Sequence, residues 1–266
     1  MTTFIETDFT FNSVNSNTYG IKIVKVQQSS MIGTPISGGK TVEQTFVSRR
    51  DKPYFYGTTM QPQELNMTFM CSTPNSFTSN FRKSVFEWLY GERKYCDFIS
   101  NDNTDKVYKI IFTSPLQFST VNLLDGYFDL SAIAYPFAYT TVKNYNYKVA
   151  STPTEIIINN LTNVQNYDGT FNYYPIIYAD LTGSSSSIKL VNKSDNNRIF
   201  EITSLNTLEE LYIDNNLKII NSSVSNANRF ESLINKQWFR LVKGENKIDV
   251  YTTCNLNIQC QYPILV

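Results

Sequence analysis

The chain has no histidine among its 266 residues. This absence excludes a Ser-His-Asp triad, a Cys-His catalytic pair and a histidine-ligated zinc site. The four cysteines, Cys71, Cys96, Cys254 and Cys260, form no Cys-x-x-Cys motif, so no zinc or redox site of that type is expected. We expect all four to be free thiols that fill apolar space in a reducing compartment.

Charge is also scarce and balanced. Only 17% of the residues are charged, and 23 basic residues face 23 acidic ones, so the formal net charge is zero. This composition gives no support for binding nucleic acid or an anionic membrane. The N-terminus lacks the basic and apolar parts of a secretory signal, and no apolar run approaches the ~20 residues of a membrane helix. We therefore expect no membrane partner and assembly in a cytoplasm.

Strand-forming residues are abundant, with 18 tyrosines and 18 phenylalanines. The length predicts about two domains, with one large all-β domain as the alternative. Residues 65–71 and 126–135 alternate as half-buried strands do, and an Asp-Gly pair at 125–126 is expected to form a turn. One helix is expected to begin within residues 73–78 and to end at Gly91. Its apolar stripe should pack on a sheet and consists of Phe77, Phe81, Val85, Trp88 and Leu89.

The second half of the chain reads as short strands separated by polar turns. Residues 140–155 are expected to be a linker that contains at most one strand. The spacing of the strands that follow is typical of an antiparallel sandwich of jelly-roll type. The expected strands are residues 173–181, 187–191, 198–203, 210–213, 217–220, 238–242, 247–251 and 256–262. We expect residues 238–250 to form a hairpin around residues 243–246.

No catalytic, cofactor-binding or metal site is predicted. Glu209 and Glu210 are adjacent in a strand pattern, so they should point to opposite faces and remain solvated rather than act as paired catalytic carboxylates. Several aspartates lie in turn-like stretches, where hydrogen bonds to the local backbone are their usual role; they are Asp102, Asp105, Asp195 and Asp214. Trp238 is expected in the core, and stacking on a sugar ring is the alternative.

Residues 48–57 combine charges and aromatic rings in a way that suits neither a core nor a solvated loop. Arginine next to tyrosine and phenylalanine is typical of protein contact surfaces. The alternative is a hairpin whose aromatic residues pack on their own domain. The long stretch 27–47 before it is either a surface loop or an arm that orders against a neighbouring subunit. The predicted subunit-interface residues are Arg49, Arg50, Asp51, Tyr54, Phe55 and Tyr56.

Taken together, several segments resemble the distal tail proteins of long-tailed phages with non-contractile tails. The resemblance includes residues 50–57 (Arg-Asp-Lys-Pro-Tyr-Phe-Tyr-Gly) and residues 238–248, which begin Trp-Phe-Arg-Leu-Val. The other segments that carry it, in the same order along the chain, are residues 9–16, 19–21, 65–69, 88–90, 126–128 and 135–139.

The resemblance implies a mainly β protein with two domains. Residues 1–145 would be a tail-tube-like β-sandwich with one α-helix that forms a ring, and residues 146–266 a galectin-like, jelly-roll β-sandwich. It also implies a structural virion protein in a hexameric ring at the tail tip, with a central channel that DNA crosses as passing cargo. Its neighbours would be the tail tube protein, the baseplate hub or tail-associated protein, and a receptor-binding protein.

The sequence thus predicts a protein without cofactor or enzymatic activity that acts by contacting copies of itself and its neighbours. The alternative function is carbohydrate binding through the C-terminal sandwich, as a lectin-like adhesion protein. A hydrolase is a third and more distant reading, since the chain shows no catalytic constellation.

Overall fold

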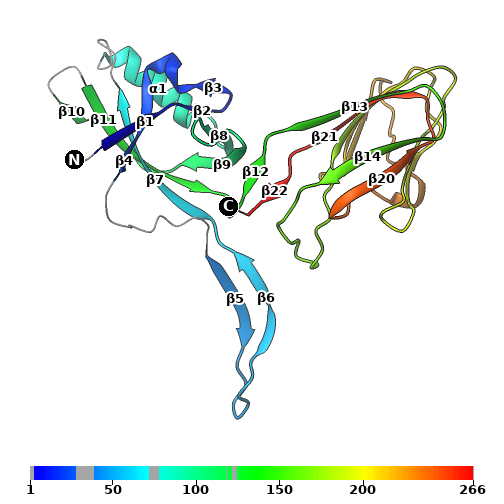
Figure 1. Ribbon diagram of the computed structural model, residues 1–266, viewed down its shortest axis with the longest axis horizontal. Coiled ribbons are helices and arrows are strands. Elements are labelled where there is room, and N and C mark those ends of the chain that lie inside the picture. Colours follow the sequence, from blue (N-terminus) through cyan, green and yellow to red (C-terminus); the bar gives the residue numbers. More distant parts are fainter. Residues whose placement is uncertain (1–2, 28–38, 72–77, 118, 122–124, 266) are drawn as a thin grey trace. The chain divides into compact units, whose positions relative to one another are not determined.

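The computed structural model describes residues 3–27, 39–71, 78–117, 119–121 and 125–265. Strands dominate, and the described residues contain one α-helix, so the predicted mainly β fold is confirmed (Figure 1). The chain divides into two compact units, Met1–Tyr139 with Leu265–Val266, and Thr140–Ile264. Each unit has its own hydrophobic core. Within the described residues, no helix is both long and apolar enough to cross a membrane.

The first unit is built on one antiparallel sheet, whose main path runs β1-β4-β7-β11-β9-β8-β2-β3. Only Asp8 separates β1 from β2, although the two strands lie near opposite ends of this path. The ends of the path therefore meet, and the sheet folds over to enclose its core. The strands are β1 (Thr3–Thr7), β2 (Phe9–Phe11), β3 (Val14–Asn15), β4 (Ile21–Gln27), β7 (Gln63–Cys71), β8 (Cys96–Ser100), β9 (Lys106–Phe112), β10 (Ser119–Val121), β11 (Asp125–Ala134) and β12 (Ala138–Thr140). A short 3-10 helix, η1 (Ser16–Tyr19), precedes β4.

Helix α1 (Ser79–Tyr90) closes this core, as its apolar stripe predicts. Val85, Trp88 and Leu89 are buried, whereas Phe77 of the expected stripe lies outside the described residues. The Trp88 ring stacks on Phe9 at 5.7 Å, and its indole N–H donates to the carbonyl oxygen of Phe11 at 3.1 Å. Burial of an aromatic ring with its polar atom satisfied stabilises such packing.

Both ends of α1 follow from the local sequence. The Thr78 hydroxyl accepts a hydrogen bond from the backbone N–H of Phe81 at 3.2 Å, which is a standard N-cap. At the other end, a Cβ on Gly91 would lie 2.4 Å from the carbonyl oxygen of Glu87. Only glycine therefore fits where the chain leaves the helix.

Replacing Thr78 with alanine is expected to destabilise the protein by about 1 kcal/mol, because one backbone donor at the helix start loses its acceptor. Thermal unfolding followed by circular dichroism measures this loss. Ser84→Ala is the matched control, since Ser84 is an exposed mid-helix residue whose hydroxyl bonds only to the Asn80 carbonyl. Equal stability of the two variants would contradict the capping role.

The second unit is a sandwich of two antiparallel sheets that share one core. The five-stranded sheet has the order β13 (Lys143–Val149), β21 (Cys254–Cys260), β15 (Ile176–Leu181), β18 (Glu210–Asp214) and β19 (Ile219–Ser222). The four-stranded sheet has the order β14 (Thr154–Asn160), β20 (Gly244–Val250), β16 (Ile188–Asn192) and β17 (Arg198–Ile202). A 3-10 helix, η2 (Ile234–Lys236), and strand β22 (Pro263–Ile264) complete the unit.

Three local expectations are wrong. The stretch 140–155 does contain the one strand allowed there, β13, but this strand pairs with β21 of the second unit, so the stretch is part of that unit and not a linker. Residues 238–242 form no strand, and Gly244 opens β20, which pairs with β14 and β16 instead of closing a hairpin. The Asp125-Gly126 pair is not a turn but the start of β11, paired with Val121 and Thr120 of β10.

Candidate functional site

Strands β5 (Lys40–Thr45) and β6 (Tyr54–Met60) form a separate two-stranded sheet (Figure 1). Gln44 pairs with Phe55 and Glu43 with Gly57, so Tyr56 is the extra residue of a β-bulge. Gly57 has a φ of 156°, a backbone conformation that residues with a Cβ rarely adopt. A bulge increases the local twist and changes the direction in which neighbouring side chains point.

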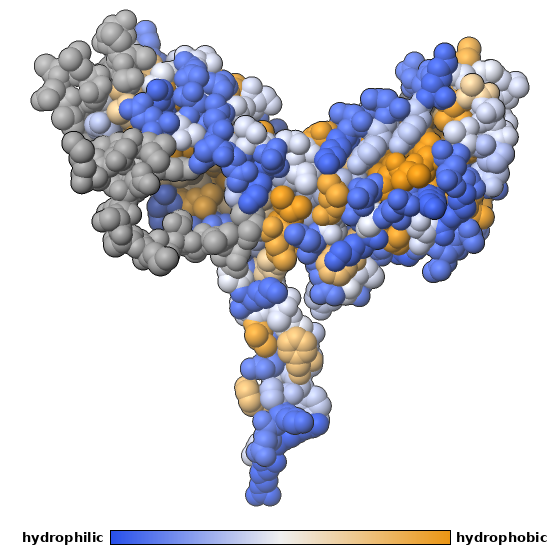
Figure 2. All heavy atoms as spheres, in the orientation of Figure 1, coloured by the Kyte–Doolittle hydropathy of each residue, from blue (hydrophilic) through white to orange (hydrophobic). Residues whose placement is uncertain are grey.

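The apolar side chains of this hairpin are exposed, although most residues of their type are buried in a folded domain. The exposed fraction is 66% for Phe46, 64% for Phe55 and 62% for Tyr56. Tyr54, Val42 and Val47 are exposed as well. Figure 2 shows hydrophobic areas along the hairpin between hydrophilic ones. Several large exposed apolar side chains on one hairpin are typical of a site of interaction with another protein.

The predicted charged residues lie in the loop between the two strands. The Arg50 guanidinium lies 4.3 Å from the centre of the Tyr54 ring. The backbone N–H of Arg50 donates a hydrogen bond to the Val47 carbonyl oxygen at 3.1 Å. Arg49 has a positive φ of 68°, and all three charged side chains are exposed. Within the described residues, neither arginine forms an ion pair with Asp51 or any other carboxylate. Both arginines are therefore available to a carboxylate of a partner.

A two-stranded hairpin is marginally stable in water by itself. The outer edges of β5 and β6 pair with no other strand in the described part of the chain. Unpaired backbone groups along an exposed strand are ready to pair with another chain. Exposed rings, free arginines and free edges together make this hairpin a suitable contact element.

The structure brings the six residues predicted for the interface into one hairpin. Arg49, Arg50 and Asp51 belong to its loop, whereas Tyr54, Phe55 and Tyr56 open β6. Sequence reasoning missed Phe46 and Val47, whose apolar character directly before the loop was the available signal. Of the stretch 27–47, residues 28–38 lie outside the described residues, and residues 40–45 form a strand.

Four acidic residues that the sequence singled out differ in their burial and in their hydrogen-bond partners. Glu209 is not solvated as predicted: its side chain has no exposed surface and forms an ion pair with Arg229 at 2.7 Å. Glu210 is exposed. Asp214 accepts hydrogen bonds from the backbone N–H groups of Asn216 and Leu217, the predicted turn role. Asp195 is instead buried in a two-bond contact with Arg240.

Trp238 and the four cysteines, which were weighed as sugar-binding and metal- or redox-active residues, lie in the core. Trp238 is buried and stacks on Phe230, so the core position predicted for it is confirmed. The four cysteines are buried and free, as predicted. In the described part of the chain, no three acidic or cysteine side chains converge as metal ligands.

Comparison with protein families finds one matching family model for each half of the chain. A family model described as a phage tail protein N-terminal domain matches residues 4–134. A second, described as a phage tail C-terminal domain, matches residues 137–260. The chain therefore belongs to this family of phage tail proteins, which are structural components of the virion tail.

Within that class its fold is like that of Dit, and this agrees with the resemblance to distal tail proteins. It is similar to Dit (gp 19.1) of phage SPP1, described as a paradigm of the hub adsorption apparatus in phages that infect Gram-positive bacteria. The TM-score is 0.62 at 8% identity, over 97% of this chain and 99% of that one. It is also similar to a chain of the phage P2 baseplate in its activated conformation, with a TM-score of 0.55 at 6% identity over 96% and 98%. Both likenesses concern the fold.

A relative is also found by sequence. The SPbeta prophage-derived uncharacterized protein YomH of Bacillus subtilis (strain 168) is 22% identical over 263 residues, which is 97% of either chain.

Proposed function

We propose that copies of this chain assemble into a hexameric ring at the distal end of the tail. The ring connects the tail tube to the baseplate hub and to the receptor-binding apparatus. The observation that supports this most is the exposed aromatic hairpin of residues 40–60, which presents apolar side chains and free arginines to a partner. In a ring each subunit contacts its neighbour through two different surfaces, and the rotation closes the assembly.

In this proposal residues 1–145 form the ring and residues 146–266 form a second domain. Arg49, Arg50, Asp51, Tyr54, Phe55 and Tyr56 are the subunit-interface residues. The aromatic rings bury apolar area on the neighbouring subunit, where a few large side chains supply most of the binding energy. The arginine forks pair with carboxylates there. The free strand edges add backbone hydrogen bonds.

The centre of the ring is a channel for DNA as passing cargo. A lining that bound phosphates strongly would slow that passage, and a zero net charge is compatible with weak contact. The protein acts without catalysis or cofactor. Its partners are other copies of itself, the tail tube protein, the hub or tail-associated protein and a receptor-binding protein, and assembly takes place in the host cytoplasm before the tail is complete.

Reversing both charges, Arg49→Glu with Arg50→Glu, is expected to impair ring assembly while the monomer stays folded. Two carboxylates would replace the arginines opposite the partner's acidic groups, and like charges facing each other across an interface cost several kcal/mol. The measurement is complementation of a phage that lacks this gene, scored by titre and by electron microscopy of its tails. We expect the titre to fall at least a hundredfold.

The matched control is Arg82→Glu with Lys83→Glu, a reversal of two adjacent exposed charges on α1 outside the hairpin. It should leave the titre within a few-fold of the wild type. Circular dichroism of the purified variants checks that each monomer is folded. Normal tails and titre with the hairpin variant would count against the proposed interface. The assay uses particles because a ring can close on a growing tail even where the free protein is monomeric.

A further inference from the structure

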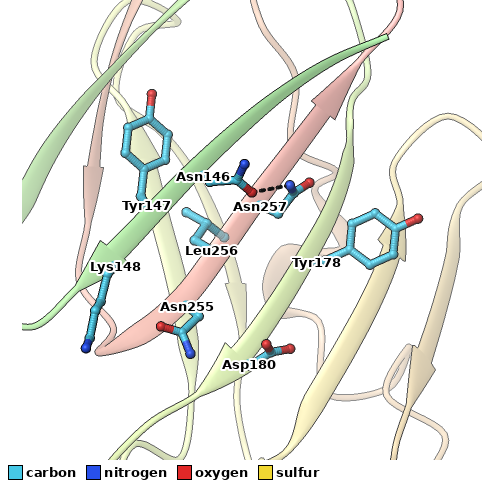
Figure 3. A pocket seen from close by; sticks show the side chains of 8 residues that line it. All are labelled: Asn146, Tyr147, Lys148, Tyr178, Asp180, Asn255, Leu256 and Asn257. Atoms are coloured by element: carbon cyan, nitrogen blue, oxygen red, sulfur yellow. Dashed lines mark hydrogen bonds between the residues drawn. The ribbon is translucent and has the colours of Figure 1, made fainter.

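The outer face of the five-stranded sheet of the second unit carries a shallow groove. Its first part is a hollow of about 400 Å³ over strands β13, β21 and β15 (Figure 3). A second hollow of about 280 Å³ lies over β15, β18 and β19, and both are lined by Tyr178 and Asp180. The two hollows are therefore parts of one groove that crosses all five strands.

The strand register places a row of amide and phenol side chains along this groove. Asn146 pairs with Asn257, Asn257 with Tyr178, Tyr178 with Tyr212, and Tyr212 with Asn221. Asn257, Tyr178 and Tyr212 lie between buried neighbours, and Asn146 and Asn221 lie between half-buried ones, so all five side chains share the outer face of the sheet. Four strand spacings of about 4.8 Å make the row roughly 19 Å long. An extended ligand several rings long would fit this length.

The row offers one aromatic platform and several amide groups. Tyr178 is 40% exposed, and its ring meets that of Tyr212 edge to face at 5.3 Å. The Asn257 amide N–H₂ donates to the Oδ1 of Asn146, and the Oδ1 of Asn257 is itself buried (Figure 3). An amphipathic ring beside amides suits a ligand that is apolar on one face and rich in hydroxyl groups at its edge.

A second row, one step further along the strands, begins with Lys148 and Asn255 and ends with two acidic residues. Asp180 and Glu210 are paired directly across β15 and β18, and both are exposed. Neither carboxylate has an ion-pair partner within the described part of the chain. Like charges in this position destabilise a sheet, so the pair is not explained by stability. The two carboxylates would repel an anionic ligand and can accept hydrogen bonds from hydroxyl groups.

We propose that this groove binds a neutral hexopyranose oligosaccharide. One sugar ring stacks on Tyr178, and the hydroxyl groups of the oligosaccharide bond to Asn146, Asp180 and Glu210. The lining mixes apolar and polar surface, which suits a sugar ring with an apolar face and hydroxyl groups at its edge, and the two carboxylates disfavour a ligand with many negative charges. This function goes beyond the ring and does not depend on the hairpin, since all the residues named lie in the second unit.

The test uses the full chain and a panel of neutral oligosaccharides, six sugars long, with α- or β-linked glucose, galactose, mannose or N-acetylglucosamine. Saturation-transfer NMR followed by titration calorimetry should detect at least one binder at millimolar concentration or below. Tyr178→Ala should weaken that binding at least tenfold, and Asp180→Asn with Glu210→Gln several-fold. Tyr178→Phe keeps the ring and should bind within about threefold of the wild type.

Tyr251→Ala is the matched control, because Tyr251 is similarly exposed but follows β20 of the other sheet. Its binding should not change. Thermal unfolding of each variant separates a lost contact from a lost fold, and the phenylalanine variant tests the ring even if the alanine variant is unstable. Failure of every oligosaccharide to bind, or equal binding by the wild type and a folded Tyr178→Ala, would overturn the proposal.

Discussion

Serine in place of Phe46, Phe55 and Tyr56 together is expected to abolish tail assembly. These three side chains are the most exposed apolar groups of the hairpin, and in the proposed ring each is buried against a neighbour. Loss of a buried aromatic anchor costs an interface about 2 kcal/mol or more, so three such losses, if additive, weaken each contact by about ten-thousandfold or more. Because a ring needs every contact at once, even a smaller loss would prevent closure.

The measurement is the fraction of particles with a complete tail tip in electron micrographs, together with the titre from the complementation assay. We expect complete tips to be absent and the titre to fall by at least three orders of magnitude. The monomer should remain folded and become more soluble, since the exposed rings contribute little to its own core. Analytical ultracentrifugation and circular dichroism of the purified variant check both points.

A matched control replaces apolar side chains of comparable exposure elsewhere. Ile157 and Ile199 are exposed on strands β14 and β17 of the second unit. Serine at both positions removes exposed apolar surface outside the hairpin, and we expect assembly to be normal. Equal damage from both sets of substitutions would mean that general surface hydrophobicity, not the hairpin, supports assembly. Normal tails with the hairpin variant would contradict the proposed interface directly.

Arg229→Ala is expected to cause the largest loss of stability of any single substitution considered. Glu209 has no exposed side-chain surface, and two nitrogens of Arg229 bind its two oxygens at 2.7 Å. Its carboxylate also accepts hydrogen bonds from the Asn206 backbone N–H and the Ser222 hydroxyl. Removing the arginine leaves a buried unpaired charge, which costs about 3–5 kcal/mol. The second unit should therefore unfold about 10 °C or more below the wild type.

Differential scanning calorimetry measures this shift. The control is Lys83→Ala, which breaks an exposed ion pair with Glu87 at 3.7 Å. Since exposed pairs contribute about 0–1 kcal/mol, its effect should be small. A similar fall in the unfolding temperature of both variants would show that the buried Glu209–Arg229 pair stabilises the fold no more than an exposed pair does.

The pH dependence of the stability lost in Arg229→Ala follows from the direction of the pKa shift of Glu209. Burial alone raises the pKa of Glu209, but the Ser222 hydroxyl, the Asn206 N–H and the Arg229 guanidinium together hold the pKa below its ordinary value of 4.5. A carboxyl with a lowered folded pKa stabilises the fold above the ordinary value, and this contribution disappears as the pH falls through the folded pKa. The stability difference between wild type and Arg229→Ala should be largest near neutral pH and shrink below pH 4.5.

Much of the first unit was predictable because its signals are local. Phe128, Leu130, Ala132 and Ala134 alternate with exposed or half-buried residues, and all four are buried in β11. Helix α1 carries an apolar stripe, an N-cap and a glycine at its end, which are all read within twelve to fourteen residues. Periodicity and capping depend on neighbours along the chain, so a sequence displays them directly.

The strand β13 shows where local signals mislead. Tyr145, Tyr147 and Val149 point inward, but asparagine and lysine fill the outward positions and are poor strand formers. The composition therefore resembled a linker. The segment is a strand because it pairs with β21. In this pair Asn146 lies opposite Asn257, which is 111 residues away along the chain.

The sequence by itself determined that the protein is mainly β, that its cysteines are free core residues, and that histidine-dependent chemistry is absent. It also located the charged and aromatic stretch whose residues the hairpin displays. Only the tertiary structure decided that those rings are exposed, that Glu209 points inward to an arginine, and that five polar residues from five strands form one row. The reason is physical: exposure, ion pairing and cross-strand alignment depend on which distant segments become neighbours, and local periodicity carries no information about that choice.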